Sequence, residues 1–320
     1  MKLKASFRSK YGSPEILSIR ELGMPIPKDD EVLIRVIAAT VNRTDYGLLK
    51  GTPFILRFFS GLFKPKFSIT GTDFAGQIEG IGINVTSFKV GDRVMGFGGM
   101  GVASHAEYLT IPEAKAILAI PANTSYEQAA AGMEGAFYAL NGIDAVNPEA
   151  GQKALVYGAT GAIGSSSVQL LRFFGLHVTA VCGSENIGLV KSLGADRIID
   201  YKKDDFTKDN EQYDFVFDAV GKTSFSSCKR LLKKHGVFIP SDGFVNVFLS
   251  LATRITGGKR VVFSPPTNLK SRLSFIRDLL ETGSFKPVID RNYPIDEIVE
   301  AYKYVATGQK IGNVIIIMGA

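Results

Sequence analysis

The second half of the chain alternates between short apolar runs and segments in which apolar residues recur at helical spacing. Four runs are each long enough for a buried parallel strand: residues 153–157, 177–182, 213–217 and 236–239. Between the first two runs, Val168, Leu171 and Phe174 fall on one face of a helix predicted over residues 165–174. This alternation, which begins near residue 125, predicts a doubly wound parallel sheet.

The first part of the chain has the pattern of a β-rich domain instead. Strands are predicted at residues 31–40, 76–82 and 105–111, and residues 90–96 are predicted as a turn followed by a strand. Near the C-terminus, a helix predicted over residues 269–280 leads to a closing strand over 313–318. The chain is therefore expected to have an α/β fold, and its length of 320 residues favours two domains.

A glycine-rich turn joins the first strand of the alternating region to its helix. It consists of Gly158, Ala159, Thr160, Gly161, Ala162, Ile163 and Gly164. Glycines let the backbone turn sharply and approach a pyrophosphate, whose charge the N–H groups of the helix's first turn receive. Because strand, turn and helix follow in this order, the sequence favours dinucleotide binding over a purely structural turn.

Composition narrows the setting and the ligand class. Two cysteines cannot form a disulfide framework or a four-cysteine zinc site, so a reducing, cytoplasmic compartment is expected. The first residues lack the apolar core of a signal peptide, and no run of apolar residues is long enough to predict a membrane span. The net charge of +6 comes from dispersed lysines and arginines and does not indicate nucleic-acid binding.

Motifs along nearly the whole chain resemble those of one enzyme family. They are Val-Asn-Arg-Thr-Asp at residues 41–45, Gly-Thr-Asp-Phe-Ala-Gly at 71–76, Val-Gly-Asp-Arg-Val at 90–94, the glycine turn, Leu-Gly-Ala-Asp at 193–196, Ile-Asp-Tyr at 199–201 and Asp-Ala-Val-Gly at 218–221. In this order they resemble the zinc-independent quinone oxidoreductase branch of the medium-chain dehydrogenase/reductases.

The resemblance implies a GroES-like β-rich catalytic domain and a Rossmann domain with a doubly wound parallel sheet. The catalytic domain is expected at residues 1–122 and 265–320, and the Rossmann domain at 123–264. A cleft between the two is expected to hold nicotinamide and substrate. The resemblance also implies a homodimer, for which the apolar edge near residues 259–263 is the expected contact.

The chain departs from the zinc-dependent branch at the metal ligands. Family alcohol dehydrogenases hold catalytic zinc through a Cys near the segment of Asn42 and through a His-Glu pair, where this chain has Thr72 and Asp73. Neither side chain replaces the thiolate and imidazole ligands that zinc requires. The histidines are far apart and are expected to pack or to lie at the surface: His105, His177 and His235. No metal is expected, and alcohol oxidation is disfavoured without a Lewis acid.

The end of the second Rossmann strand decides between NADH and NADPH. NAD-specific folds carry an Asp or Glu there, whereas this strand ends at Cys182. In the family, the adenosine phosphate is surrounded by the positions of Ser184, Asn186 and Tyr201, with positive potential added by Lys202 and Lys203. Glu185 is the alternative, as a ribose ligand, although it also suits the first turn of a helix capped by Ser184. NADPH is favoured.

The resemblance implies contacts with nicotinamide and its ribose from Val220, Pro240, Ser241, Ile311 and Asn313. Many relatives have a Thr near the nicotinamide, where this chain has Met133-Glu134-Gly135-Ala136, so the contacts of that region stay open. Cys182 and Cys228 are expected to pack rather than react.

Asn42 is the best candidate for a contact with the substrate. Its carboxamide can donate to a carbonyl oxygen and stabilise the enolate that hydride addition creates. Tyr46 and Tyr138 are candidate proton donors or stacking partners, and Asp45 is expected to brace the loop. The predicted function is NADPH-dependent, zinc-free reduction of quinones or of the C=C bond of small, apolar α,β-unsaturated carbonyl compounds. An enoyl-thioester reductase and a non-enzymatic NADPH-binding protein stay open as alternatives.

Two apolar segments have more than one interpretation. Residues 53–67 interleave aromatic with basic residues, which predicts either a lid over an apolar pocket or a surface helix that touches membranes. The lid is favoured, because the segment follows Asn42 closely. Residues 244–251 follow the nicotinamide turn and are expected to line the same pocket or a subunit interface. Core packing is the alternative for both.

Overall fold

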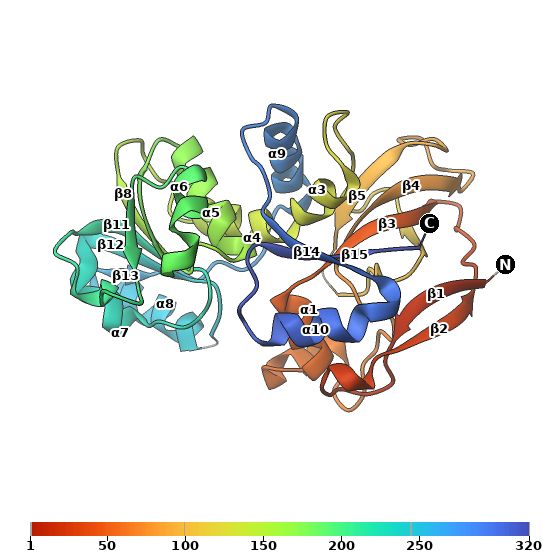
Figure 1. Ribbon diagram of the computed structural model, residues 1–320, viewed down its shortest axis with the longest axis horizontal. Helices are drawn as coiled ribbons and strands as arrows, with labels where there is room; N and C mark the ends of the chain where they lie inside the picture. Colours follow the sequence, from red (N-terminus) through yellow and green to blue (C-terminus); the bar gives the residue numbers. More distant parts are fainter. Residues whose placement is uncertain (1, 99, 244, 320) are drawn as a thin grey trace. The chain divides into compact units, whose positions relative to one another are not determined.

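The computed structural model describes residues 2–98, 100–243 and 245–319. These residues form two compact units, one of Met1–Glu134 with Leu273–Ala320 and one of Gly135–Arg272 (Figure 1). Each unit has its own sheet. The α/β fold with a β-rich domain and a doubly wound parallel sheet is confirmed.

The first unit is built on a mixed sheet that, within the described residues, has seven strands in the order β14-β15-β3-β4-β5-β7, with β6 paired to β3. The strands are β3 (Glu31–Val41), β4 (Asp73–Ile81), β5 (Arg93–Phe97), β6 (Tyr108–Pro112), β7 (Ile117–Ala119), β14 (Ile289–Pro294) and β15 (Asn313–Ile317). Two further strands, β1 (Lys2–Phe7) and β2 (Ser18–Gly23), pair antiparallel with each other. The C-terminal strand β15 runs antiparallel to β3 and places Val314 opposite Val41. This pairing brings Asn313, the first residue of β15, beside Asn42.

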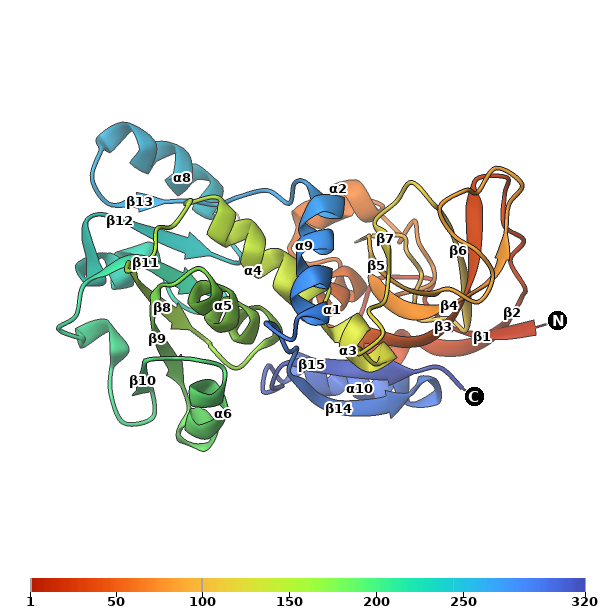
Figure 2. The same cartoon turned by 90° about the horizontal axis from the view of Figure 1, so that it is seen from above.

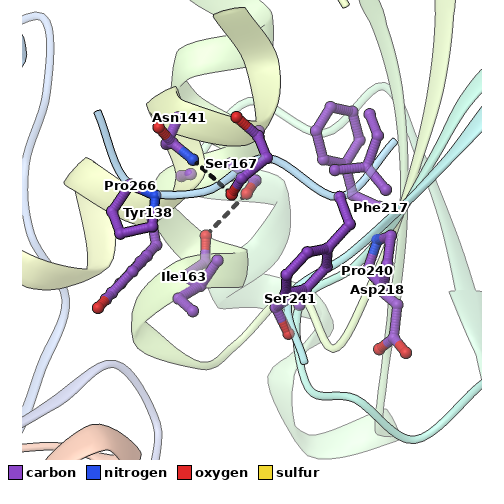
Figure 3. A pocket seen from close by; sticks show the side chains of 15 residues that line it. Tyr138, Asn141, Ile163, Ser167, Phe217, Asp218, Pro240, Ser241 and Pro266 are labelled. Carbon is purple, nitrogen blue, oxygen red and sulfur yellow. Dashed lines mark hydrogen bonds between the residues drawn. The ribbon is translucent and has the colours of Figure 1, made fainter. Parts of the chain in front are cut away.

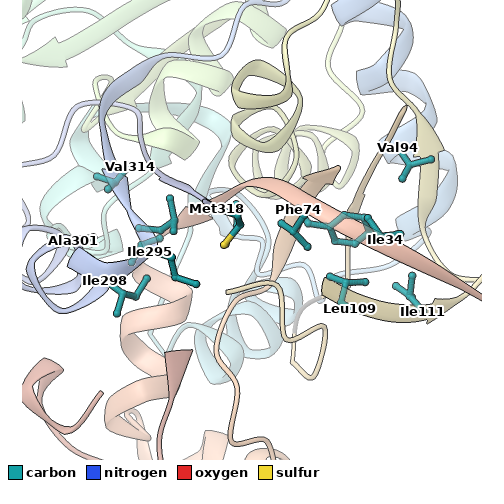
Figure 4. Packing of buried hydrophobic residues seen from close by; sticks show 14 of the residues in the cluster. Ile34, Phe74, Val94, Leu109, Ile111, Ile295, Ile298, Ala301, Val314 and Met318 are labelled. Carbon is teal, nitrogen blue, oxygen red and sulfur yellow. The ribbon is translucent and has the colours of Figure 1, made fainter. Parts of the chain in front are cut away.

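Apolar side chains from both ends of the chain close the core of this unit (Figure 4). Ile34 and Val314 are fully buried in β3 and β15, and Phe74 is fully buried in β4. Ile298 and Ala301 cover them from α10 (Ile298–Ala306). Burial of such side chains stabilises the fold by about 1.5–3 kcal/mol each. The core therefore fixes the position of the C-terminal segment relative to β3.

The helices of this unit are short. They are α1 (Arg43–Lys50), α2 (Arg57–Ser60), α3 (Tyr126–Ala131) and α10, with 3-10 turns η1 (Pro14–Ile16), η2 (Phe54–Leu56) and η6 (Ile295–Glu297). The helix α9 (Leu269–Glu281) begins in the second unit and ends in the first. α3 packs against β3, β4 and β15, and so it lies with the β-rich unit rather than with the Rossmann unit.

The second unit contains a parallel sheet in the strand order β10-β9-β8-β11-β12-β13. Its strands are β8 (Lys153–Tyr157), β9 (His177–Cys182), β10 (Arg197–Asp200), β11 (Tyr213–Asp218), β12 (Leu232–Pro240) and β13 (Arg260–Val261). Numbered within the unit this order is 3-2-1-4-5-6, which is the order of dinucleotide-binding sheets. The order reverses between β8 and β11, and ligands of such sheets bind beyond the carboxyl ends of the strands at that point.

The helices of the second unit flank the sheet. They are α4 (Glu134–Asp144), α5 (Ala162–Phe173), α6 (Ile187–Ser192), α7 (Phe225–Cys228) and α8 (Val245–Thr256), with 3-10 turns η3 (Ser184–Asn186), η4 (Phe206–Lys208) and η5 (Lys229–Leu231). α5 packs against β8 and β9, and α8 lies beside β13 (Figure 2). β13 has two residues, so the edge near residues 259–263 is shorter than expected, and the homodimer stays a prediction. In the described part of the chain, no helix is long and apolar enough to cross a membrane.

Candidate active site and cofactor site

The glycine turn has the backbone geometry that a dinucleotide site needs. Gly158 has φ 78°, and a Cβ added there would lie 2.5 Å from Cγ1 of Val220. A Cβ on Gly164 would lie 2.1 Å from the carbonyl oxygen of Gly158. Around Gly161, by contrast, the nearest atom to an added Cβ is 3.9 Å away. The first and third glycines are therefore required by the protein's own packing, and the middle one leaves open space beside the N-terminus of α5 for a pyrophosphate.

The turn after β11 holds Val220 against Gly158. The carboxylate of Asp218, which is almost fully buried, accepts from the backbone N–H groups of Val220 at 3.1 Å and Gly221 at 2.9 Å. Its other oxygen accepts from the N–H of Thr223 at 3.1 Å. Burial raises the pKa of Asp218, and these N–H groups oppose the rise. The motif at residues 218–221 is thus a turn that the side chain of its first residue, Asp218, stabilises by hydrogen bonds to the backbone.

A pocket lies beyond the carboxyl ends of β11 and β12 (Figure 3). Its lining includes Tyr138 from α4, Ile163 from α5, Asp218 from β11, and Pro240 with Ser241 at the end of β12. Four of the predicted site residues on this unit thus line one pocket: Tyr138, Ile163, Pro240 and Ser241. The residues present fit a nicotinamide dinucleotide: the turn supplies the pyrophosphate cradle, and this pocket lies at the strand ends where the rest of the cofactor extends.

The loop after β9 carries a mixture of charges. Ser184 donates to Oδ2 of Asp200 at 2.5 Å, and Lys202 pairs with Glu185 at 2.7 Å. The hydrogen bond from Ser184 lowers the pKa of Asp200, with burial opposing. Tyr201 is 52% exposed. The predicted phosphate ligands Ser184, Asn186 and Tyr201 all lie around this loop, and Glu185 is occupied by Lys202.

The β-rich unit contains a buried polar cluster centred on Asn42. Its Nδ2 lies 2.7 Å from Oγ1 of Thr40, 3.3 Å from Oε2 of Glu134 and 3.4 Å from Oδ1 of Asn313. Its Oδ1 accepts from Nζ of Lys310 at 3.0 Å. Asn42 is 4% exposed, and both hydrogens of its amide have partners within the protein. The carboxamide therefore bridges an ammonium group and a carboxyl group.

Lys310 reaches Asn42 from the loop that precedes β15. Its ammonium also donates to the carbonyl oxygen of Gly312, which has φ 64°. A Cβ on Gly312 would lie 2.1 Å from the carbonyl oxygen of Val288, so only glycine permits this close turn. Desolvation lowers the pKa of Lys310 to about 8, and the nearby Glu134 opposes that fall.

The pKa values of the acidic residues in the cluster are raised, whereas that of Lys310 is lowered. Burial, reinforced by Glu134, raises the pKa of Asp73 to about 8. Burial also raises the pKa of Glu134 itself, and that of Asp45 by a large margin. Oγ1 of Thr72 lies 3.3 Å from Oε2 of Glu134. Groups with pKa values displaced toward neutrality are typical of sites that move protons.

The positions that hold zinc in the zinc-dependent branch are used here for internal hydrogen bonds. Asp73 accepts from the N–H of Thr40 at 2.8 Å and from its hydroxyl at 2.6 Å. Among the described residues, no three His, Cys, Asp or Glu side chains are grouped as a metal site would require. His105 is fully buried between Thr70 and the carbonyl oxygen of Thr40, at 2.8 Å from each. Burial lowers its pKa to about 4, so it is neutral and part of the core.

The remaining predicted residues are placed separately. Tyr46 packs against the apolar core of the β-rich unit, with Nζ of Lys50 5.5 Å from its ring centroid. The N–H of Ile311 donates to Asp290 at 2.8 Å, and Asn313 donates to the carbonyl oxygen of Val288 at 3.0 Å. Both free cysteines are buried in the Rossmann unit, and burial raises the pKa of each thiol to about 11: Cys182 and Cys228.

A second, smaller pocket in the β-rich unit lies under the segment 53–67. Ser60 and Phe67 of that segment line it, together with the nearly buried Arg8, Thr72 and Tyr302. Thr72 also contacts Glu134, so this pocket adjoins the polar cluster.

Sequence reasoning missed Lys310 and assigned no role to Glu134. Glu134 was visible only as a departure from the family pattern at residues 133–136. Lys310 comes directly before Ile311-Gly312-Asn313, the motif predicted to contact nicotinamide and its ribose. Its position there, at the start of the closing strand that pairs with β3, is the signal that could have identified it.

Comparisons with known proteins identify both parts of the chain as dehydrogenase domains. The family model described as an alcohol dehydrogenase GroES-like domain matches residues 28–122, and that of zinc-binding dehydrogenases matches residues 193–316. The chain is 32% identical to 2-methylene-furan-3-one reductase of Solanum lycopersicum, over 98% of this chain and 79% of that protein. It is also 32% identical to a chloroplastic quinone oxidoreductase of Triphysaria versicolor, over 92% of each.

Among solved structures, the quinone oxidoreductase from Coxiella burnetii has the same fold, with a TM-score of 0.89 over 99% of both chains at 23% identity. From the two units, the strand order and these relatives together, the chain belongs to the medium-chain dehydrogenase/reductase superfamily, as a nicotinamide-dependent oxidoreductase related to quinone oxidoreductases and enone reductases.

Proposed function

We propose that this protein is an NADPH-dependent reductase that works without zinc and acts on quinones or on the C=C bond of α,β-unsaturated carbonyl compounds. The observation that carries the proposal is the bridge from Lys310 through Asn42 to Glu134. It adjoins Thr72, which stands with Asp73 in place of the His-Glu pair of the zinc-dependent branch. The names of relatives support the substrate class, since one in Arabidopsis thaliana, 30% identical, is an NADPH-dependent alkenal/one oxidoreductase.

The polar cluster supplies what such a reaction needs on the oxygen side of the substrate. Bound NADPH supplies the hydride, which adds to a carbon of the conjugated system. Negative charge then develops on the carbonyl oxygen, and a fixed donor that is stronger in the transition state accelerates the step. The ammonium of Lys310 is proposed to stabilise that negative charge and to supply the proton that completes the reduction, and it is reprotonated from solvent. A pKa of about 8 leaves it protonated at neutral pH and still able to release a proton.

Asn42 has two proposed roles that experiment separates. In the first, it donates directly to the substrate oxygen, for which it must exchange its contact with Glu134 or Asn313. In the second, it holds the ammonium of Lys310 in place through its Oδ1. In both, loss of the carboxamide slows turnover while the glycine turn still binds cofactor.

The preference for NADPH rests on the loop after β9. The strand ends at Cys182 rather than at a carboxylate, and Lys202 neutralises Glu185. Lys203 lies 3.9 Å from Asp200 and adds positive charge to the same loop. Because Glu185 is paired, it is a weaker competitor for the ribose than an unpaired acid would be.

The direct test is NADPH oxidation by the purified protein with a panel of quinones, small enones and enoyl thioesters, with and without a zinc chelator. We expect turnover of an enone or a quinone that the chelator leaves unchanged. Activity restored only by added zinc would overturn the zinc-free reaction, and activity confined to enoyl thioesters would replace the substrate class.

A further inference from the structure

Residues 53–67, which we call the aromatic-basic segment, carry four phenylalanines that are exposed. Phe54, Phe58, Phe59 and Phe63 are 58, 63, 67 and 91% exposed. Phenylalanine is usually buried, and a contiguous group of exposed rings marks a contact surface. The predicted lid accounts for the inner face of the segment, because Ser60 and Phe67 line the pocket beneath it. The outer face requires a second explanation.

Polar contacts anchor the segment to the protein. The hydroxyl of Tyr11 lies 2.7 Å from that of Ser60 and donates to the carbonyl oxygen of Gly61 at 2.6 Å. Arg57 donates to the carbonyl oxygen of Gly51 at 3.1 Å, and its guanidinium stacks 4.6 Å from the ring of Tyr11. Phe54 also contacts Arg57, at 5.5 Å from the guanidinium to the ring centroid. Since these contacts hold the backbone, we expect the exposed rings of Phe59 and Phe63 to contribute little to folding.

The charge of this region has one sign. From Tyr46 to Thr72 the sequence has four basic residues, Lys50, Arg57, Lys64 and Lys66, and no acidic one. Aromatic rings next to lysines on a short, non-spanning element are typical of segments that lie in the headgroup region of a bilayer. Each Lys or Arg near an anionic surface adds attraction that salt weakens.

From these observations we infer that the aromatic-basic segment docks the protein on an anionic lipid surface. A second copy of the chain fits the surface less well, because protein interfaces are depleted of lysine at their centre and a self-contact would place like charges together. The inference rests on the proposed function for its purpose: apolar quinones and enones partition into lipid, and the docked segment would place the pocket under Ser60 and Phe67 next to that supply.

Vesicle co-sedimentation tests the docking. Unmodified protein should bind vesicles of phosphatidylcholine mixed with phosphatidylglycerol, bind phosphatidylcholine alone much more weakly, and be released by salt. The double variant Phe59→Ser/Phe63→Ser should lose at least tenfold in affinity. Lys64→Gln/Lys66→Gln should lose roughly tenfold or more on the mixed vesicles only.

Matched controls keep the result specific. Ile26→Ser/Ile83→Ser removes two residues of the same unit that are 86 and 87% exposed outside the segment, and it should bind like the unmodified protein. Phe248→Ser/Leu251→Ser tests the exposed face of α8 in the same way. All variants should keep their melting temperature, and the Ile26→Ser/Ile83→Ser control should also keep its NADPH turnover with a water-soluble enone.

Three outcomes would overturn the inference: no binding to the mixed vesicles, binding lost only in the α8 variant, or a dimer that the Phe59→Ser/Phe63→Ser variant dissociates without any vesicle binding. Failure of the proposed function would give a different result. The protein would then not oxidise NADPH in solution, whether or not it binds vesicles.

Discussion

The candidate sites of the two units are built from different parts of the chain. In the Rossmann unit the cofactor site is made largely by backbone, and its turn is seven consecutive residues from Gly158 to Gly164. In the β-rich unit the site is made by side chains, and Lys310 reaches Asn42 from 268 positions along the chain. The first kind of site depends on glycines that permit close packing, at Gly158 and Gly164, and open space, at Gly161. The second depends on buried titratable groups whose pKa values are shifted by burial and by one another, so its behaviour should change with pH.

The largest expected effect is on turnover through Asn42. Asn42→Ala removes the bridge to Lys310, and loss of one such donor costs about 3 kcal/mol, roughly a hundredfold in kcat. Affinity for NADPH should change little, because the glycine turn is untouched. Steady-state kinetics with cofactor titration separates the two, with Tyr46→Phe as the control. Turnover of Asn42→Ala at the unmodified rate would reduce Asn42 to a brace of its loop.

The next effect separates two glycines of one turn. Gly164→Ala should destabilise the protein by about 1–3 kcal/mol, because its Cβ would meet the carbonyl oxygen of Gly158 at 2.1 Å. Gly161→Ala, with φ −71° and no atom closer than 3.9 Å, should leave stability unchanged and weaken cofactor binding alone. Urea unfolding and NADPH titration of both variants measure this. Equal destabilisation by the two variants would contradict the assignment of Gly164 to packing and Gly161 to cofactor binding.

A smaller effect follows from the buried acids. The pKa of Asp73 is about 8 in the folded protein, above its unfolded value, so its contribution to stability is present below about pH 4 and is lost as pH rises toward 8. One titrating group changes the free energy of unfolding by at most ~1.4 kcal/mol per pH unit. Urea unfolding between pH 5 and 8 should show a shallower decline in Asp73→Asn than in the unmodified protein. The exposed control Asp296→Asn should show the same decline in unfolding free energy as the unmodified protein. Parallel curves for the unmodified protein and both variants would show that a group other than Asp73 causes the decline.

The smallest effect is on the choice of cofactor. Ser184→Asp places a second carboxylate next to Asp200, which Ser184 contacts at 2.5 Å, and should narrow a preference for NADPH by several-fold. Fluorescence titration with NADPH and NADH gives the ratio, with Ser192→Asp as an exposed control on α6. If the unmodified protein binds both equally, Glu185 returns as the ribose ligand.

Local patterns in the sequence predicted the Rossmann unit well. The strands at 153–157 and 177–182 have the predicted bounds, because a buried parallel strand is a continuous apolar run. The helix after the glycine turn begins at Ala162 rather than at Ser165, since the turn itself enters the helix. β12 begins at Leu232, ahead of the predicted residue 236, because its first part is exposed and polar.

The β-rich site could not be predicted in the same way. Lys310 is one of 37 basic residues, and nothing local distinguishes it from those at the surface. Its role depends on β15 pairing with β3, which is a contact between the two ends of the chain. The exposed rings of residues 53–67 posed the same difficulty, since the sequence alone does not show whether an aromatic residue is buried or exposed. Phe244, the first residue of the other apolar segment, lies outside the described residues. The rest of that segment belongs to α8, in which Phe248 and Leu251 are exposed and Leu249 packs against the core.

The most direct test of a charged lysine in place of a metal is the pH dependence of kcat. If the ammonium of Lys310 serves the substrate oxygen, kcat should be constant near neutrality and fall above about pH 8, where the pKa of Lys310 lies. Lys310→Met should be slower by about a hundredfold and lose this alkaline limb. A kcat for the unmodified protein that stays level through pH 9, or a Lys310→Met variant with unchanged rate and profile, would contradict the account.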